Sequence, residues 1–123
     1  RPEDAGEAVE WLRELGAVDD AAMARRVVQR CAAKGYGPGR VRQELYQKGI
    51  PREYWEEALE GLPDLSEAVD RFLEQRFRGE PPDQKEIQRA VQALQRRGHD
   101  WEEIRSALRR YEDRLEEIED RKT

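Results

Sequence analysis

The sequence holds little from which a catalytic or metal-binding centre could be built. Its 123 residues include one cysteine and one histidine. One cysteine cannot form an internal disulfide, and Cys31 with His99 cannot supply the ligands of a structural zinc site. We therefore expect no metal, no cofactor and no enzymatic activity. The low cysteine content also predicts a reducing, cytoplasmic location.

Long apolar runs are missing as well. No run exceeds four apolar residues, whereas a membrane-spanning helix needs about 20. Hydrophobic residues make up 37% of the chain and charged residues 41%. Such polarity favours a thin, elongated core over a compact body around a deep pocket, and it predicts no membrane partner.

Helix-forming residues dominate what is present, and no segment alternates apolar and polar residues with a period of two. The sequence therefore predicts an all-α protein of about seven helices, divided by glycine and proline. The expected helices cover 2–15, 19–34 (capped by Asp19 or Asp20), 38–49 and 51–61, and then begin at Asp64, Asp83 and Asp100. Each of these last three aspartates precedes a glutamate by three residues, the acidic form of a capping box.

An internal repeat organises these helices. The segment 45–50 (Leu-Tyr-Gln-Lys-Gly-Ile) returns 49 residues later as 94–99 (Leu-Gln-Arg-Arg-Gly-His), with a fainter copy at 12–17. His99 takes the place of Ile50, so we interpret it as a packing residue. The repeat predicts an elongated tandem array of three-helix units. Its expected parts are the last helix of an incomplete first repeat (1–18), two repeats (19–62 and 63–111) and an acidic helical extension (112–123).

The net charge of −5 conceals a block of the opposite sign. Residues 25–49 contain seven bases and one acid, Glu44. Arg26, Arg30 and Lys34 are each four residues apart, so they form one stripe along a helix. Such a stripe suits phosphates or an acidic protein surface, and equally a solvated face paired with neighbouring acids. The opposite face, with Met23, Val27, Val28 and Cys31, is predicted core.

The sequence leaves the roles of some aromatic residues open. Tyr36, within Gly-Tyr-Gly-Pro-Gly, is either a packing residue or an exposed anchor beside the stripe. Trp11, Trp55 and Trp101 are predicted core. From Trp101 to Ile118 the last helix has apolar residues spaced three and four apart, a coiled-coil seam that packs within its own repeat or against a partner helix.

The basic block resembles a known family. The segment 19–50 contains Asp-Asp-Ala-Ala-Met-Ala-Arg, then Lys-Gly-Tyr-Gly-Pro, then Val-Arg-Gln-Glu-Leu and Lys-Gly-Ile. This succession is similar to the RecX family, regulators that restrain the bacterial RecA recombinase, with Met23 where an aromatic is common and Val41 for Ile. Residues 94–108 resemble the weaker C-terminal repeat of that family.

The resemblance implies a non-enzymatic inhibitor that lies in the groove of the RecA–single-stranded-DNA filament. It would block filament extension and suppress ATP hydrolysis, strand exchange and LexA cleavage. It implies contacts with RecA and with the DNA inside the filament, made by a monomer. The matched residues expected to bind are Arg25, Arg26, Arg30, Lys34, Tyr36, Arg40, Arg42 and Lys48.

Two other functions remain open from the sequence. Short helices joined by tight turns superficially resemble DNA-binding helix-turn-helix modules, although an isoelectric point near 5.1 argues against binding through phosphates alone. A helical scaffold that dimerises through its last helix is the other possibility.

Overall fold

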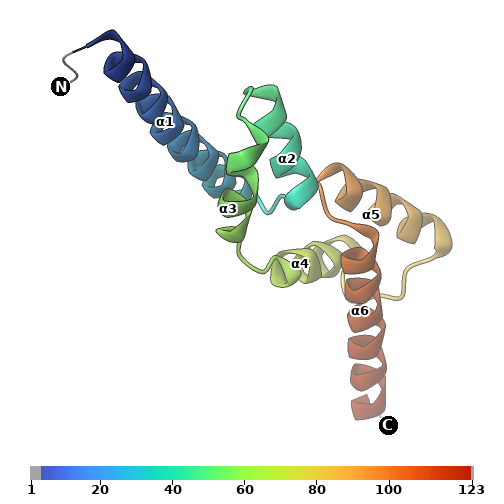
Figure 1. Ribbon diagram of the computed structural model, residues 1–123. Coiled ribbons are helices and arrows are strands. Elements are labelled where there is room, and N and C mark those ends of the chain that lie inside the picture. The colour runs from blue at the N-terminus through green and yellow to red at the C-terminus, as the bar shows by residue number, and fades with distance from the viewer. Residues whose placement is uncertain (1–3, 123) are drawn as a thin grey trace.

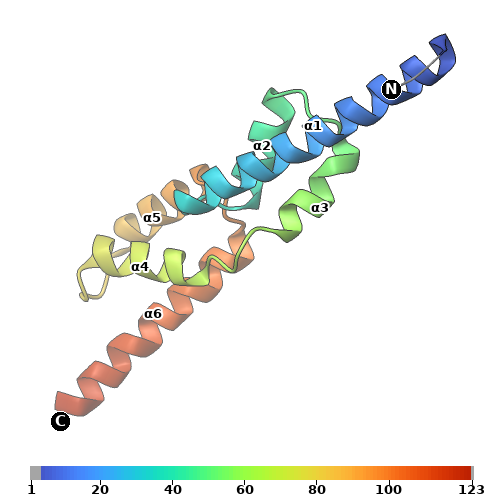
Figure 2. The ribbon, with the colours of Figure 1, turned by 90° about the vertical axis from the view of Figure 1, so that its left-hand side faces the viewer.

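The computed structural model describes residues 4–122, and this part of the chain is all-α (Figure 1). It is elongated, with its two ends at opposite extremes of the molecule (Figures 1 and 2). No helix in the described range is long and apolar enough to cross a membrane. The elements are α1 (Ala5–Ala33), α2 (Pro38–Gln47), the 3₁₀ turn η1 (Arg52–Tyr54), α3 (Trp55–Glu60), α4 (Ser66–Phe77), α5 (Gln84–Arg96) and α6 (Trp101–Lys122).

The expected count of seven helices is wrong, because the first two are one continuous helix. α1 runs through Gly16 without a break. An internal glycine costs a helix only about 1 kcal/mol, and strong helix formers flank this one. Asp19 and Asp20 are consequently not caps; Asp4 caps α1 by accepting from the Glu7 N–H at 2.7 Å. The expected start at Pro2 lies outside the described residues.

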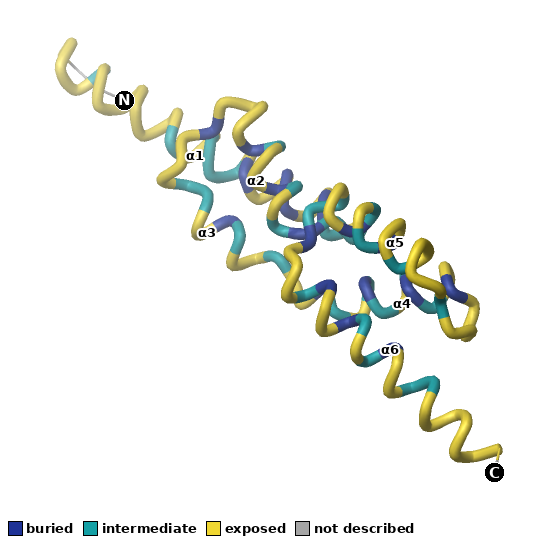
Figure 3. Tube along the Cα trace, turned by 90° about the vertical axis from the view of Figure 1, so that its right-hand side faces the viewer, coloured by how far each residue is buried: buried dark blue, intermediate teal, exposed yellow. Residues whose placement is uncertain are grey.

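Two separate apolar cores lie along the molecule (Figure 3). The first joins the C-terminal half of α1 to α2 and α3, and the second joins α4, α5 and α6. Val27, Cys31 and Leu45 are central to the first, and Leu73 and Leu94 to the second. Each three-helix unit thus buries its own thin core.

The two copies of the repeat end their second helices in the same way. Gly49 follows α2 with φ = 70°, and Gly98 follows α5 with φ = 95°, in the left-handed region that glycine adopts without strain. The next residues, Ile50 and His99, donate their N–H groups to Leu45 and Leu94 carbonyls, both at 3.1 Å. Ile50 and His99 are both buried, which confirms the interpretation of His99 as a packing residue.

Helix starts follow the sequence less closely. The capping box of Asp83 and Glu86 is confirmed, with the Glu86 N–H donating to Asp83 at 2.8 Å. Asp64 instead accepts from the Ser66 N–H, two residues on. The helix expected over 51–61 is the turn η1 followed by the short α3.

Several residues expected in the core are exposed. Trp11 is 45% exposed and Trp101 51%, and Met23 also lies at the surface. At about 100° per residue, the apolar residues before Asp19 point nearly opposite to those after it. α2 and α3 cover only the later face, so Trp11 has no neighbouring helix. Trp55 alone of the three tryptophans packs on a core, and its indole N–H donates to the Ile50 carbonyl at 2.8 Å.

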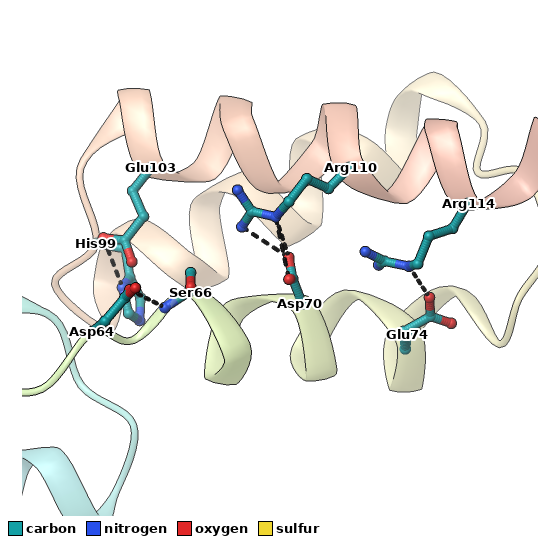
Figure 4. Close-up of polar contacts among 8 residues, drawn as sticks. All are labelled: Asp64, Ser66, Asp70, Glu74, His99, Glu103, Arg110 and Arg114. Carbon is teal, nitrogen blue, oxygen red and sulfur yellow. Dashed lines mark hydrogen bonds and ion pairs between the residues drawn. The ribbon is translucent and has the colours of Figure 1, made fainter.

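Polar contacts fasten α6 along α4 (Figure 4). Arg110 pairs with Asp70 through two guanidinium nitrogens, and Arg114 donates to Glu74 at 2.8 Å. Tyr111 is fully buried beneath them. The middle of the predicted seam therefore packs within its own repeat.

A close backbone joint connects the two units. A Cβ placed on Gly37 would lie 2.5 Å from the Gly98 carbonyl oxygen, so the two backbones nearly touch. We call this the glycine joint. Four hydrogen bonds cross it in the described part of the chain: Gly37 N–H to Arg97 O (2.8 Å), Gly39 N–H to Gly98 O (3.0 Å), Arg97 guanidinium to Lys34 O (2.8 Å) and His99 Nε2 with Gly35 O (3.0 Å).

Candidate partner-binding surface

The predicted basic stripe lies on the surface of α1. Arg26, Arg30 and Lys34 are all exposed. Arg30 stands in the last turn, and Lys34 follows it as the C-cap. Cations are favoured there because the helix dipole and the last carbonyls are negative.

One acid compensates part of this charge. Glu44 on α2 binds the Arg30 guanidinium at 2.8 Å and lies 3.5 Å from Arg40 Nε. The hydrogen bond from Arg30 lowers the pKa of the Glu44 carboxyl, despite the opposing effect of its partial burial. Arg30 and Arg40 therefore carry less free positive charge than their exposure suggests.

The Cys31 thiol also donates to Glu44, with 3.4 Å between Sγ and Oε2. Burial is the main reason that the pKa of this thiol is raised. A buried thiol with a raised pKa is a poor nucleophile at neutral pH. Among residues 4–122, no group of three or more potential ligands could hold a metal ion.

Tyr36 is a packing residue that also has cations around it. Its ring is half-buried and packs against the first core. Cations also surround it: Arg40 lies 4.6 Å from the ring centroid, Arg97 5.5 Å and Lys34 5.9 Å. Tyr36 thus positions three cations on the surface, in contacts that are each worth roughly 0.5–1 kcal/mol at exposed sites.

Three of the eight predicted residues lie away from this surface. Arg25 precedes Arg26 and lies about 100° from it around α1, where it lines a shallow pocket with Tyr54 and Glu57. Arg42 stands two residues after Arg40, nearly opposite to it around α2. Lys48 lies at the far end of α2, as its C-cap.

The second unit adds residues that the sequence did not single out. Arg97 reaches Tyr36 across the glycine joint and also lies 5.8 Å from the Phe72 ring. Arg76 lies 5.7 Å from the same ring, and Arg71 lies beside it. Arg97 had a local signal, because residues 88–110 contain six bases and three acids. Arg71 and Arg76 had none, because they belong to a segment rich in acids.

Comparison with known proteins finds two family domains in succession. Residues 19–59 match the family model of the second three-helix domain of RecX, and residues 64–108 match the third. The chain belongs to the RecX family. It is 35% identical over 116 residues to a protein of Cronobacter sakazakii named Regulatory protein RecX. It is 36% identical over the same length to proteins of that name in Escherichia coli and Shigella boydii. Each alignment covers 90% of this chain and 68% of the relative.

The RecX domains coincide with the two cores. The second domain holds the later half of α1 with α2 and α3, and the third holds α4, α5 and the first two turns of α6. The glycine joint and the ring of cations around Tyr36 therefore lie at the junction of two RecX domains.

Proposed function

We propose that this chain is a non-enzymatic negative regulator of the RecA recombinase. It binds in the groove of the RecA–single-stranded-DNA filament and limits filament extension, and with it ATP hydrolysis, strand exchange and LexA cleavage. Membership of the RecX family is the observation that carries the proposal. The protein acts as a monomer in the cytoplasm.

The elongated shape and the charge pattern support this function. A thin array of helices with a basic centre and acidic ends suits a groove whose walls alternate in charge. The contact surface that we assign consists of Arg30, Lys34, Tyr36 and Arg40, which are linked by contacts near the end of α1, and of Arg26, one turn before Arg30. Arg25, Arg42 and Lys48 would contribute from other sides of the chain.

The decisive experiment measures single-stranded-DNA-dependent ATP hydrolysis by RecA while this chain is added. We expect the rate to fall at substoichiometric ratios. Reversing Arg26→Glu and Lys34→Glu should abolish the effect, because neither side chain pairs with a carboxylate among the described residues. The reversal Arg105→Glu with Arg109→Glu on α6 changes the charge equally and should leave inhibition intact.

If the variant with both charge reversals in α1 still inhibits RecA fully, the basic surface is not the contact surface. No inhibition by the parent chain would refute regulation by these two units themselves. Direct binding to naked DNA is the second candidate, favoured by cations near the junction that lack an acidic partner. It requires a strongly salt-dependent affinity for DNA in the absence of RecA.

Dimerisation through α6 is disfavoured by the packing. Ile104 and Tyr111, in the middle of the apolar seam, are buried against the chain's own helices. A partner helix would reach only the exposed ends of the seam at Trp101 and Ile118. Sedimentation at tens of micromolar tests this, and a dimer would contradict the proposed monomer.

A further inference from the structure

A small groove lies between the two RecX domains. It encloses about 250 Å³ and is open to solvent. The C-terminal end of α1 forms one wall, α4 forms another, and the end of α5 closes it. We call it the inter-domain groove, and its principal lining residues are Lys34, Gly35, Ala68, Arg71, Phe72 and Arg97.

The groove is positively charged and uncompensated. Lys34, Arg71 and Arg97 line it, and no acidic residue does. None of these three cations forms an ion pair with a carboxylate in residues 4–122. Arg30 and Arg110, by contrast, each pair with a carboxylate.

Of the two arginines that line the groove, Arg97 is held in place before any partner arrives. Arg40, Tyr36, Arg97, Phe72 and Arg76 form a continuous series of alternating guanidinium and ring, with successive separations of 4.6, 5.5, 5.8 and 5.7 Å. We call it the arginine–aromatic stack. A guanidinium placed over a ring keeps its N–H edge available for a planar anion. Restricting it in advance also lowers the entropy lost on binding.

The stack argues against single-stranded nucleic acid as the occupant. Proteins that hold single strands offer aromatic faces on which bases stack. Here the Tyr36 and Phe72 rings are already covered by guanidiniums. A long polyanion would also meet acidic ends on both sides. Residues 4–20 contain six acids and one base, and residues 112–122 contain six acids and three bases.

We propose that the inter-domain groove binds a short run of aspartate and glutamate side chains on a protein partner. A volume of about 250 Å³ is below the usual size of a small-molecule site, roughly 300–1,000 Å³, and accommodates individual carboxylate side chains. The flanking acids restrict the partner's acidic run to the length of the groove. This inference rests on the proposed function only in taking the partner to be a protein.

The test uses the complete, ¹⁵N-labelled chain and a fluorescent peptide of alternating Asp and Glu, ten residues long. We expect salt-sensitive binding, with NMR shifts confined to the arginine side chains and amides of the groove. Arg71→Gln with Arg97→Gln should weaken binding about tenfold per arginine. The matched control, Arg105→Gln with Arg109→Gln, should bind like the parent.

A second variant separates the loss of charge from a disturbance of the glycine joint. Arg97 donates to the Lys34 carbonyl, whereas Arg71 has no such bond, so Arg71→Gln alone removes charge without touching the glycine joint. The proposal is overturned if this variant binds the peptide like the parent. It is also overturned if a twelve-nucleotide oligothymidylate displaces the peptide and binds the groove more tightly.

The two proposals fail in distinguishable ways. Inhibition of RecA without peptide binding would refute the groove assignment and leave regulation standing. Peptide binding that needs Arg71, combined with no effect on RecA, would refute the proposed function and leave the groove as an acidic-segment site.

Discussion

A single methyl group should separate the two RecX domains. Gly37 has φ = −87°, so alanine is compatible with its backbone conformation. An added Cβ would nevertheless lie 2.5 Å from the Gly98 carbonyl oxygen and 2.8 Å from the His99 nitrogen. Both are backbone atoms that cannot rotate aside. The variant Gly37→Ala must therefore push the domains apart at the glycine joint.

The expected loss follows from the hydrogen bonds of the joint. Four of them cross it, and each contributes about 0.5–1.5 kcal/mol net. Opening the joint should thus destabilise the association of the domains by about 2–6 kcal/mol. Each domain retains its own core, so the helices themselves should persist.

Urea unfolding followed by circular dichroism measures this effect. The parent should unfold in one transition, and Gly37→Ala in two, or in one at a lower midpoint. Gly16→Ala is the matched control, because the same methyl group there meets nothing within 4 Å. It should stabilise α1 by about 1 kcal/mol through helix propensity alone.

An unchanged midpoint in Gly37→Ala would refute this account of the joint. Equal destabilisation by Gly16→Ala would refute it as well, because the loss would then come from the helices and not from the contact between domains.

Three further results are expected. Glu44→Gln should lower the free energy of unfolding by about 1 kcal/mol at neutral pH, because it removes the carboxylate that pairs with Arg30. The pKa of Glu44 is lowered in the folded protein, so the parent should lose this stability as the pH falls below the ordinary range of a glutamate. The variant should show no such loss. Tyr111→Phe should cost about 1 kcal/mol by removing the 2.7 Å bond to the Glu80 carbonyl, and since burial raises the Tyr111 pKa, the alkaline loss of stability above pH ~10 should be smaller in the variant. Cys31 should react with iodoacetamide at neutral pH far more slowly in the folded protein than in urea, and equal rates would contradict its burial.

Local pattern predicted much of the fold. The glycines after α2 and α5, the buried faces around Val27 and Leu45, and the repeat itself follow from spacing over a few residues. Such features depend on residues within one or two helical turns of each other, and their spacing can be counted in the sequence.

The errors came where a local signal was weak or ambiguous. Gly16 resembles a helix stop, but the free-energy cost of one isolated glycine is too small to end a helix where no cap terminates it. Trp11 lies on an apolar face, and only the placement of α2 and α3 decides that this face stays uncovered.

The sequence alone determined an all-α repeat protein with a basic block in an acidic chain, and its resemblance to the RecX family. Only the tertiary structure decided which cations act together. It placed Glu44 between Arg30 and Arg40, and it brought Arg97 to the Lys34 carbonyl, 63 residues away. The tertiary structure also brought the backbones of Gly37 and Gly98 into close approach, and no periodicity along the chain encodes a contact between such distant residues.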